Sequence, residues 1–172
     1  MASLIDSLIE TLNGEDLEYQ RLLDLSVSKT DVIVRGDLNA LSVITDKEQE
    51  IVSRITALEN SRTSTMTEIA KILNTDVAGL KLDDLINLLK KKPGEQKRLS
   101  TVHDNLHATL YQMKTVNERN EELLKESIEM VNFNMNLIQA MRKAPETANY
   151  NKGAYNTGAS LGITSGGFDA KQ

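Results

Sequence analysis

The fold of this chain is decided by the stretch from Glu95 to Lys143, which reads EQKRLSTVHDNLHATLYQMKTVNERNEELLKESIEMVNFNMNLIQAMRK. It contains neither proline nor glycine, and its apolar residues recur at intervals of three and four, the spacing of one face of an α-helix. These residues are Leu99, Val102, Leu106, Leu110, Met113, Val116, Leu123, Leu124, Ile128, Val131, Met135 and Ile138. Such a helix would be roughly 75 Å long. We therefore expect other helices to lie alongside it and to bury this stripe.

The apolar stripe is interrupted near its middle, where Asn117 and Asn120 stand between Val116 and Leu123. A polar residue in an otherwise apolar seam sets the register of packed helices at some cost in stability. We interpret Asn117 and Asn120 as a structural polar seam.

The first part of the chain carries an apolar face from Leu4 onward, which predicts a first helix ending at Val34 or Arg35. We expect Ser3 and Asp6 to form a capping box at its start. At its end, Gly36 supplies a left-handed residue and the following aspartate caps the next helix. So short a link predicts that the second helix folds back antiparallel on the first.

The second helix carries an apolar stripe that is imperfect. Its polar interruptions are Glu48, Arg62 and Thr65. Residues 74–79 close this helix, and a short helix follows from about Asp83 to Lys91. The leucines expected to face inward from it are Leu85, Leu88 and Leu89. Pro93 then breaks the short helix before the long one begins.

The C-terminal part has a different character, because residues 145–172 hold five of the nine glycines and no apolar periodicity. Such a segment cannot bury enough apolar surface to offset its ordering entropy. The predicted domains are a helical coiled-coil domain at 1–144 and a flexible, glycine-rich binding tail at 145–172. The fold class is all-α: an elongated antiparallel helical coiled coil of three long helices and one short helix, with a flexible C-terminal tail.

The composition excludes several classes of function. A net charge of −5 argues against a nucleic-acid partner, which needs a basic face. No apolar stretch reaches ~18 residues, so we expect no membrane insertion. The start lacks the features of a secretory signal, and the chain has no cysteine. We expect a cytoplasmic protein.

One motif has the spacing of catalytic metal ligands. His103 and His107 stand four residues apart on the long helix, close to the pattern of zinc proteases. The acid between them is Asp104 where the mechanism uses glutamate, and the chain has no third histidine. We expect no enzyme, no catalytic residue, no cofactor and no metal. A metal-dependent hydrolase is the alternative that tight zinc binding at both histidines would indicate.

Methionines and aromatic residues suggest where a partner binds. Methionine fills cores, and it also lines adaptable binding grooves. Glycine-separated aromatic residues in the tail are anchors that a partner can hold, although an inert terminus is the alternative. The predicted partner-binding residues are Met130, Met135, Met141, Tyr150, Tyr155 and Phe168.

Four segments resemble the FlgN family of flagellar export chaperones. They are Arg35–Leu41 (RGDLNAL), Val116–Asn120 (VNERN) followed by Leu123 and Leu124, the tyrosine Tyr150 after the long helix, and the ending Phe168–Lys171 (FDAK). The resemblance implies a cytoplasmic chaperone without ATPase activity. Its partners would be the hook-associated (hook-filament junction) proteins, whose terminal helical regions it holds unassembled, and the flagellar export gate, to which it delivers them.

The alternative is a structural protein, a coiled-coil or filament subunit that spaces other components. Such a subunit should self-associate strongly and would need no mobile tail. Self-association into a homo-oligomer also remains open for the chaperone.

Overall fold

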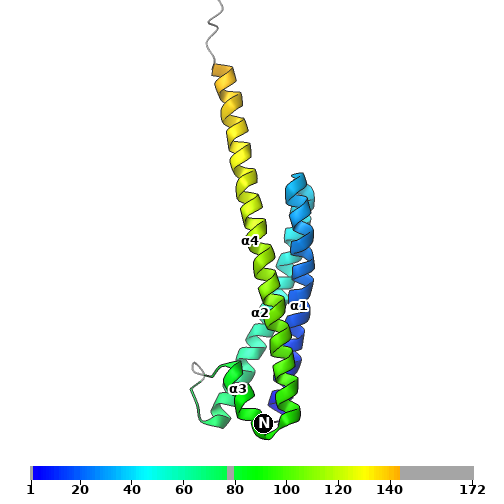
Figure 1. Cartoon of the computed structure of the whole chain (residues 1–172), viewed down its shortest axis with the longest axis vertical. Coiled ribbons are helices and arrows are strands. Elements are labelled where there is room, and N and C mark those ends of the chain that lie inside the picture. The colour runs from blue at the N-terminus through cyan, green and yellow to red at the C-terminus, as the bar shows by residue number, and fades with distance from the viewer. Residues whose placement is uncertain (1, 77–79, 144–172) are drawn as a thin grey trace, which may run out of the picture. The chain divides into compact units, whose positions relative to one another are not determined.

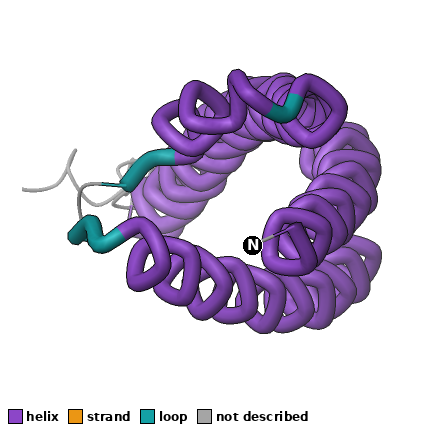
Figure 2. The backbone as a smooth tube through the Cα atoms, turned by 90° about the horizontal axis from the view of Figure 1, so that it is seen from below, coloured by secondary structure: helices purple, strands orange, loops and turns teal. Residues whose placement is uncertain are grey.

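The structure is a computed structural model that describes residues 2–76 and 80–143. Its elements are α1 (Ala2–Arg35), α2 (Leu38–Leu73), α3 (Leu82–Leu88), the 3-10 turn η2 (Leu89–Lys91) and α4 (Pro93–Lys143). Figure 1 labels the four α-helices. Seen from below in Figure 2, the described backbone is helical apart from short connecting loops. The prediction of an all-α fold is confirmed, with no strand among the described residues.

The chain forms two compact units, at residues 1–129 and 130–172, and α4 contributes to both. The first unit holds α1, α2, α3 and the larger part of α4. The second unit contributes only residues 130–143 to the described part of the chain. The tail predicted at 145–172 lies outside the described residues, and the division at residue 144 stays a prediction.

The hairpin between α1 and α2 forms as its sequence predicts. Gly36 has a φ of +67°, the left-handed conformation that ends a helix at glycine. The side chain of Asp37 accepts a hydrogen bond of 3.0 Å from the backbone N–H of Ala40 and so caps α2. Glu15 of α1 pairs with Arg62 of α2, and Lys29 further along α1 pairs with Glu48, so the two helices run antiparallel.

The long helix α4 runs parallel to α1 within the first unit. Near the start of both helices, Arg98 donates to Asp6 at 2.7 Å. Further along both, Asn120 donates to the backbone oxygen of Ser26 at 2.8 Å. Residue numbers therefore rise together along the two helices, and α2 runs against both. The coiled-coil arrangement of the three long helices stays a prediction.

Two helix starts differ from the predictions. The described part of α1 begins at Ala2, so Ser3 lies inside the helix and is no cap. Asp6, its expected partner in a capping box, is paired with Arg98 of α4. The helix α4 begins at Pro93, two residues before the expected start, because proline suits the first turn of a helix.

The core of the first unit consists of two apolar clusters. The larger one joins all four α-helices, with Ile5, Leu8, Ile9, Leu12, Ile69, Leu85, Leu89, Leu99, Val102 and Leu106 buried in it. The smaller one lies further along the helices and contains Leu22, Ile51, Ile55 and Met113. The expectation for Leu88 was wrong: it is 57% exposed, because the residues of this region that face the core are Leu85 and Leu89, with Leu82 and Ile86 packed beside them.

Candidate functional site

A charged layer is buried between α1 and α2. The carboxylate of Glu15 accepts a hydrogen bond of 2.9 Å from Arg62, and its side chain retains only 2% of its exposure. Burial raises the pKa of Glu15, and the bond and charge of Arg62 only partly oppose this shift. The neighbouring Tyr19 donates to Glu59 at 3.2 Å. Burial first, and then the charge of Glu59, raises the pKa of Tyr19.

The same two helices make a second polar contact closer to their hairpin. Glu48 of α2 accepts hydrogen bonds from Lys29 at 2.7 Å and from Ser26 at 3.3 Å. Sequence reasoning did not predict these contacts, although it found Glu48 and Arg62 as gaps in the stripe of α2. The missing signal was that Glu15 and Ser26 are the matching gaps in the stripe of α1. Paired gaps in facing stripes indicate a polar layer.

The two asparagines of the predicted polar seam occupy different environments. Asn120 is buried and bonded to α1 through both ends of its amide. Its nitrogen donates to the backbone oxygen of Ser26 at 2.8 Å, and its oxygen accepts from Thr30 at 2.6 Å. Asn117 is exposed and lines a groove between α1, α2 and α4. Asn120 therefore ties α4 to α1 beside that groove.

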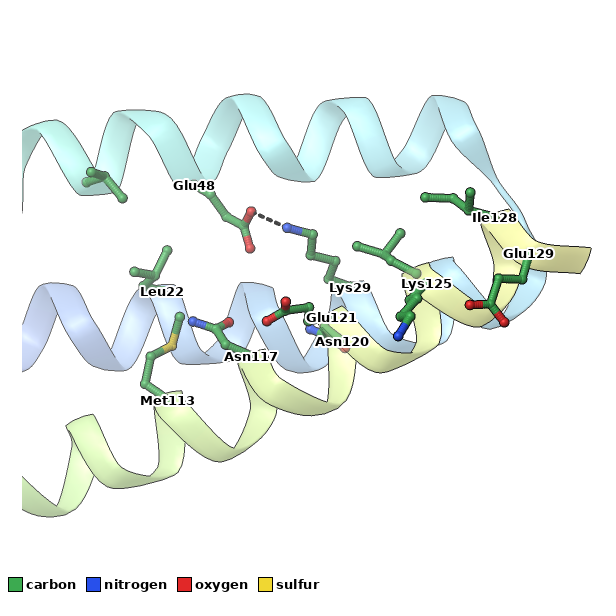
Figure 3. A pocket seen from close by; sticks show the side chains of 12 residues that line it. Leu22, Lys29, Glu48, Met113, Asn117, Asn120, Glu121, Lys125, Ile128 and Glu129 are labelled. Carbon is green, nitrogen blue, oxygen red and sulfur yellow. Dashed lines mark hydrogen bonds and ion pairs between the residues drawn. The ribbon is translucent and has the colours of Figure 1, made fainter. Parts of the chain in front are cut away.

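A groove of about 780 Å³ opens between α1, α2 and α4 in the first unit (Figure 3). Its apolar lining is Leu22, Val52, Met113, Leu124 and Ile128, and its polar lining is Lys29, Glu48, Asn117, Asn120, Glu121, Lys125 and Glu129. Figure 3 shows Glu48 reaching from α2 towards Lys29 of α1, the one ion pair drawn there. The groove thus combines an apolar floor with charges of both signs.

The groove lies along the C-terminal part of α1, which contributes Leu22 and Lys29 to its lining. The bonds between α1 and α4 join residues 90 to 94 positions apart in the sequence. In that register, Arg35 at the end of α1 comes level with about Ile128 of α4. Ile128 is 60% exposed. The hairpin therefore ends in register with the last residues of the first unit.

The described part of the second unit is an exposed apolar helix. Its large apolar side chains are Met130, Val131, Phe133, Met135, Leu137, Ile138 and Met141, each between 49% and 71% exposed. No Asp, Glu, Lys or Arg occurs from Met130 to Met141. We call residues 130–141 the bare segment. The expectation that Leu110, Ile128, Val131, Met135 and Ile138 are buried was wrong, because these residues are 39% to 60% exposed and the last buried residue on this face is Asn120.

Three of the predicted partner-binding residues fall in the bare segment. They are Met130, Met135 and Met141, which are 66%, 54% and 71% exposed. The other three, Tyr150, Tyr155 and Phe168, lie outside the described residues. Sequence reasoning did not select Phe133 and Leu137, although they stand four residues apart on one side of the helix. Phe133 and Leu137 lie outside the apolar stripe that the sequence analysis followed along this helix.

The two histidines lie on α4 beside α3. His103 has its Nε2 atom 3.7 Å from a carboxylate oxygen of Asp83 and its Nδ1 atom 3.2 Å from Asp104. The ring centres of His103 and His107 are 6.4 Å apart. Among the described residues, no three His, Cys, Asp or Glu side chains are grouped so that they could hold a metal ion.

Comparison with known proteins gives one family. The family model described as FlgN protein matches residues 1–157. A curated Bacillus subtilis (strain 168) protein, the uncharacterized protein YvyG, is 25% identical over 147 residues, which cover 84% of each chain. No solved structure matches. Over the described ranges, the structure contains no helix long and apolar enough to span a membrane.

Proposed function

The chain belongs to the FlgN family, and from that premise we propose that it is a cytoplasmic flagellar export chaperone. In this proposal it binds the terminal helical regions of hook-associated proteins, the proteins of the hook-filament junction. Binding prevents their premature assembly, and the chaperone then delivers them to the export gate. It needs no cofactor and catalyses no reaction.

The observation that carries the proposal is the exposure of the bare segment. Soluble proteins rarely leave a contiguous apolar surface uncovered, and such surfaces mark binding sites. The terminal regions of a subunit that assembles later carry apolar helical surface which has to be covered until assembly. The bare segment can cover such a surface, because its seven large apolar side chains are each about half exposed or more. Three of the seven are methionines, whose unbranched side chains adapt to more than one partner.

The tail has a second role in the proposal. Tyr150, Tyr155 and Phe168 would order on contact with the substrate or with the export gate. Aromatic anchors between glycines can bind in this way, with part of the interaction energy lost to ordering. Each aromatic ring that becomes buried could contribute ~2 kcal/mol.

The exposed apolar side chains of α4 also favour a second candidate, a self-associating coiled-coil subunit. The two candidates differ in what covers these side chains, another copy of the chain or a different protein. Sedimentation of the purified protein distinguishes them. A chaperone that binds another protein through the bare segment should sediment as the same species over a wide concentration range. A filament subunit should grow with concentration.

The test is a titration with a purified hook-associated protein from the same genome. We expect wild type to bind it, and a Met130→Ser, Met135→Ser, Met141→Ser variant to bind it about tenfold more weakly or worse. A matched control exchanges three residues of similar exposure in the first unit, Leu17→Ser, Val43→Ser and Ile72→Ser, and should bind like wild type.

A third variant, Tyr150→Ala, Tyr155→Ala, Phe168→Ala, tests the tail. If this variant binds the hook-associated protein like wild type and also supports normal export, the tail has no role in the proposal. If wild type itself does not bind, the proposed function is wrong.

A further inference from the structure

The bare segment carries two apolar stripes. One consists of Val131, Met135 and Ile138, and the other of Met130, Phe133, Leu137 and Met141. At ~100° per residue, the centres of the two stripes lie about 120° apart around the helix. All seven side chains are exposed in the structure. The two stripes together span more than half of the circumference of the segment, with the uncharged Asn134 lying between them.

One partner helix cannot cover such a surface. A helix that packs against one neighbour buries an arc of about 100°, with polar side chains on the rest of its surface. A single partner on the stripe with Val131 would leave Phe133 and Leu137 in water, and the reverse arrangement would leave Val131 and Ile138 in water. The free-energy cost of leaving that apolar stripe in water would therefore remain in the complex.

The absence of charged residues from the bare segment also argues against a single partner helix. A helix docked on a surface through one stripe usually carries charges at the edge of the contact, where they stay hydrated. From Met130 to Met141 the chain has none. The residues opposite the two stripes are Asn132, Asn136 and Gln139, which are polar but uncharged. A segment without charge on any side is suited to lie in an uncharged apolar groove rather than on an open surface.

We propose that the bare segment inserts between two helices of the substrate and completes a helical bundle with them. The inference rests on the proposed function and specifies the partner: two adjacent helices with an uncharged apolar groove between them. One helix contacts the stripe of Val131, Met135 and Ile138. The other contacts the stripe of Met130, Phe133, Leu137 and Met141. The substrate then has no uncovered groove that a further subunit could enter.

The test removes one stripe at a time. One variant carries Val131→Gln and Ile138→Gln, and the other carries Phe133→Gln and Leu137→Gln. The matched control, Asn132→Gln and Asn136→Gln, changes the polar face. Glutamine favours helix, and the exchanged residues are exposed, so the fold should survive; circular dichroism checks this. The probe is the purified full-length hook-associated protein, titrated into each variant.

We expect each stripe variant to bind about tenfold more weakly or worse, and the polar-face control to bind like wild type. Weakening by one stripe variant alone would overturn the inference in favour of a single partner helix. Wild-type binding by both stripe variants would overturn it and leave the proposed function intact. Loss of a wild-type dimer in both variants, with unchanged substrate binding, would assign the stripes to a second copy of this chain. Absence of any binding by wild type would overturn the proposed function as well.

Discussion

The two ends of α4 share one sequence pattern and differ in what covers them. Between Leu99 and Asn120, four of the apolar residues spaced by three and four are buried in the core, namely Leu99, Val102, Leu106 and Met113. Between Met130 and Met141 the same spacing continues, yet every large apolar side chain is exposed. The comparison teaches that periodicity identifies an apolar face but not its partner. The first end uses the face to build the core, and we propose that the second end keeps it for another protein.

The largest expected effect contrasts one leucine from each end. Leu99→Ala should lower the free energy of unfolding by ~2–5 kcal/mol, because it opens a cavity in the larger core cluster. Leu137→Ala should change it by less than about 0.5 kcal/mol, because Leu137 is 49% exposed. Urea denaturation of the two variants measures the difference. Equal losses would show that the second end is also part of a packed core.

A smaller effect is expected at the polar seam. Asn120→Leu removes two hydrogen bonds to α1 and leaves the hydroxyl of Thr30 without its contact on α4. The free energy of unfolding should fall by about 1 kcal/mol. Asn117→Leu is the matched control, three residues away and exposed, and should change little. A gain in stability for Asn120→Leu would mean that apolar packing outweighs the two bonds.

The smallest expected effect concerns Glu15, whose pKa burial raises above its ordinary value of 4.5. Between 4.5 and the raised value, the folded protein binds a proton that the unfolded chain has released. The contribution of Glu15 to stability therefore rises as pH falls through this window and is lowest at neutral pH. Glu15→Gln should equal or exceed wild type at pH 7 by less than about 1 kcal/mol, because Arg62 keeps 35% exposure and its hydration.

The pH dependence supplies the check for Glu15. In urea denaturation, any advantage of Glu15→Gln over wild type should shrink as the pH is lowered from 7 towards 4.5. An advantage that grows on acidification would mean that the ion pair with Arg62 holds the pKa of Glu15 below its ordinary value.

Much of the fold could be predicted from the sequence, because its boundaries rest on local chemistry. The left-handed glycine at 36, the cap at Asp37 and the proline at 93 all mark helix ends where the structure has them. The capping box predicted at the start of α1 was wrong, and Asp6 instead pairs with Arg98, a residue 92 positions away. A capping motif of four residues carries no information about such a distant partner.

The candidate site was predictable only in part. The methionines of the bare segment stood out in the sequence, but their exposure depends on which side chains pack against them, and the periodicity of one helix does not give that. The layer of Glu15 and Arg62 was missed for a similar reason. Each residue looked like a defect in its own helix, and only their pairing across two helices turns the two defects into one contact.

The central claim is that the bare segment is uncovered in the free protein and covered by the substrate. Methionine oxidation by dilute peroxide, read by mass spectrometry, measures it directly, because oxidation of a thioether requires access. The chain supplies its own control in Met113, which is 7% exposed on the same helix. The account predicts fast oxidation of Met130, Met135 and Met141 in the free protein, and slow oxidation of all three with saturating hook-associated protein. Unchanged rates at these three methionines in the complex would contradict it.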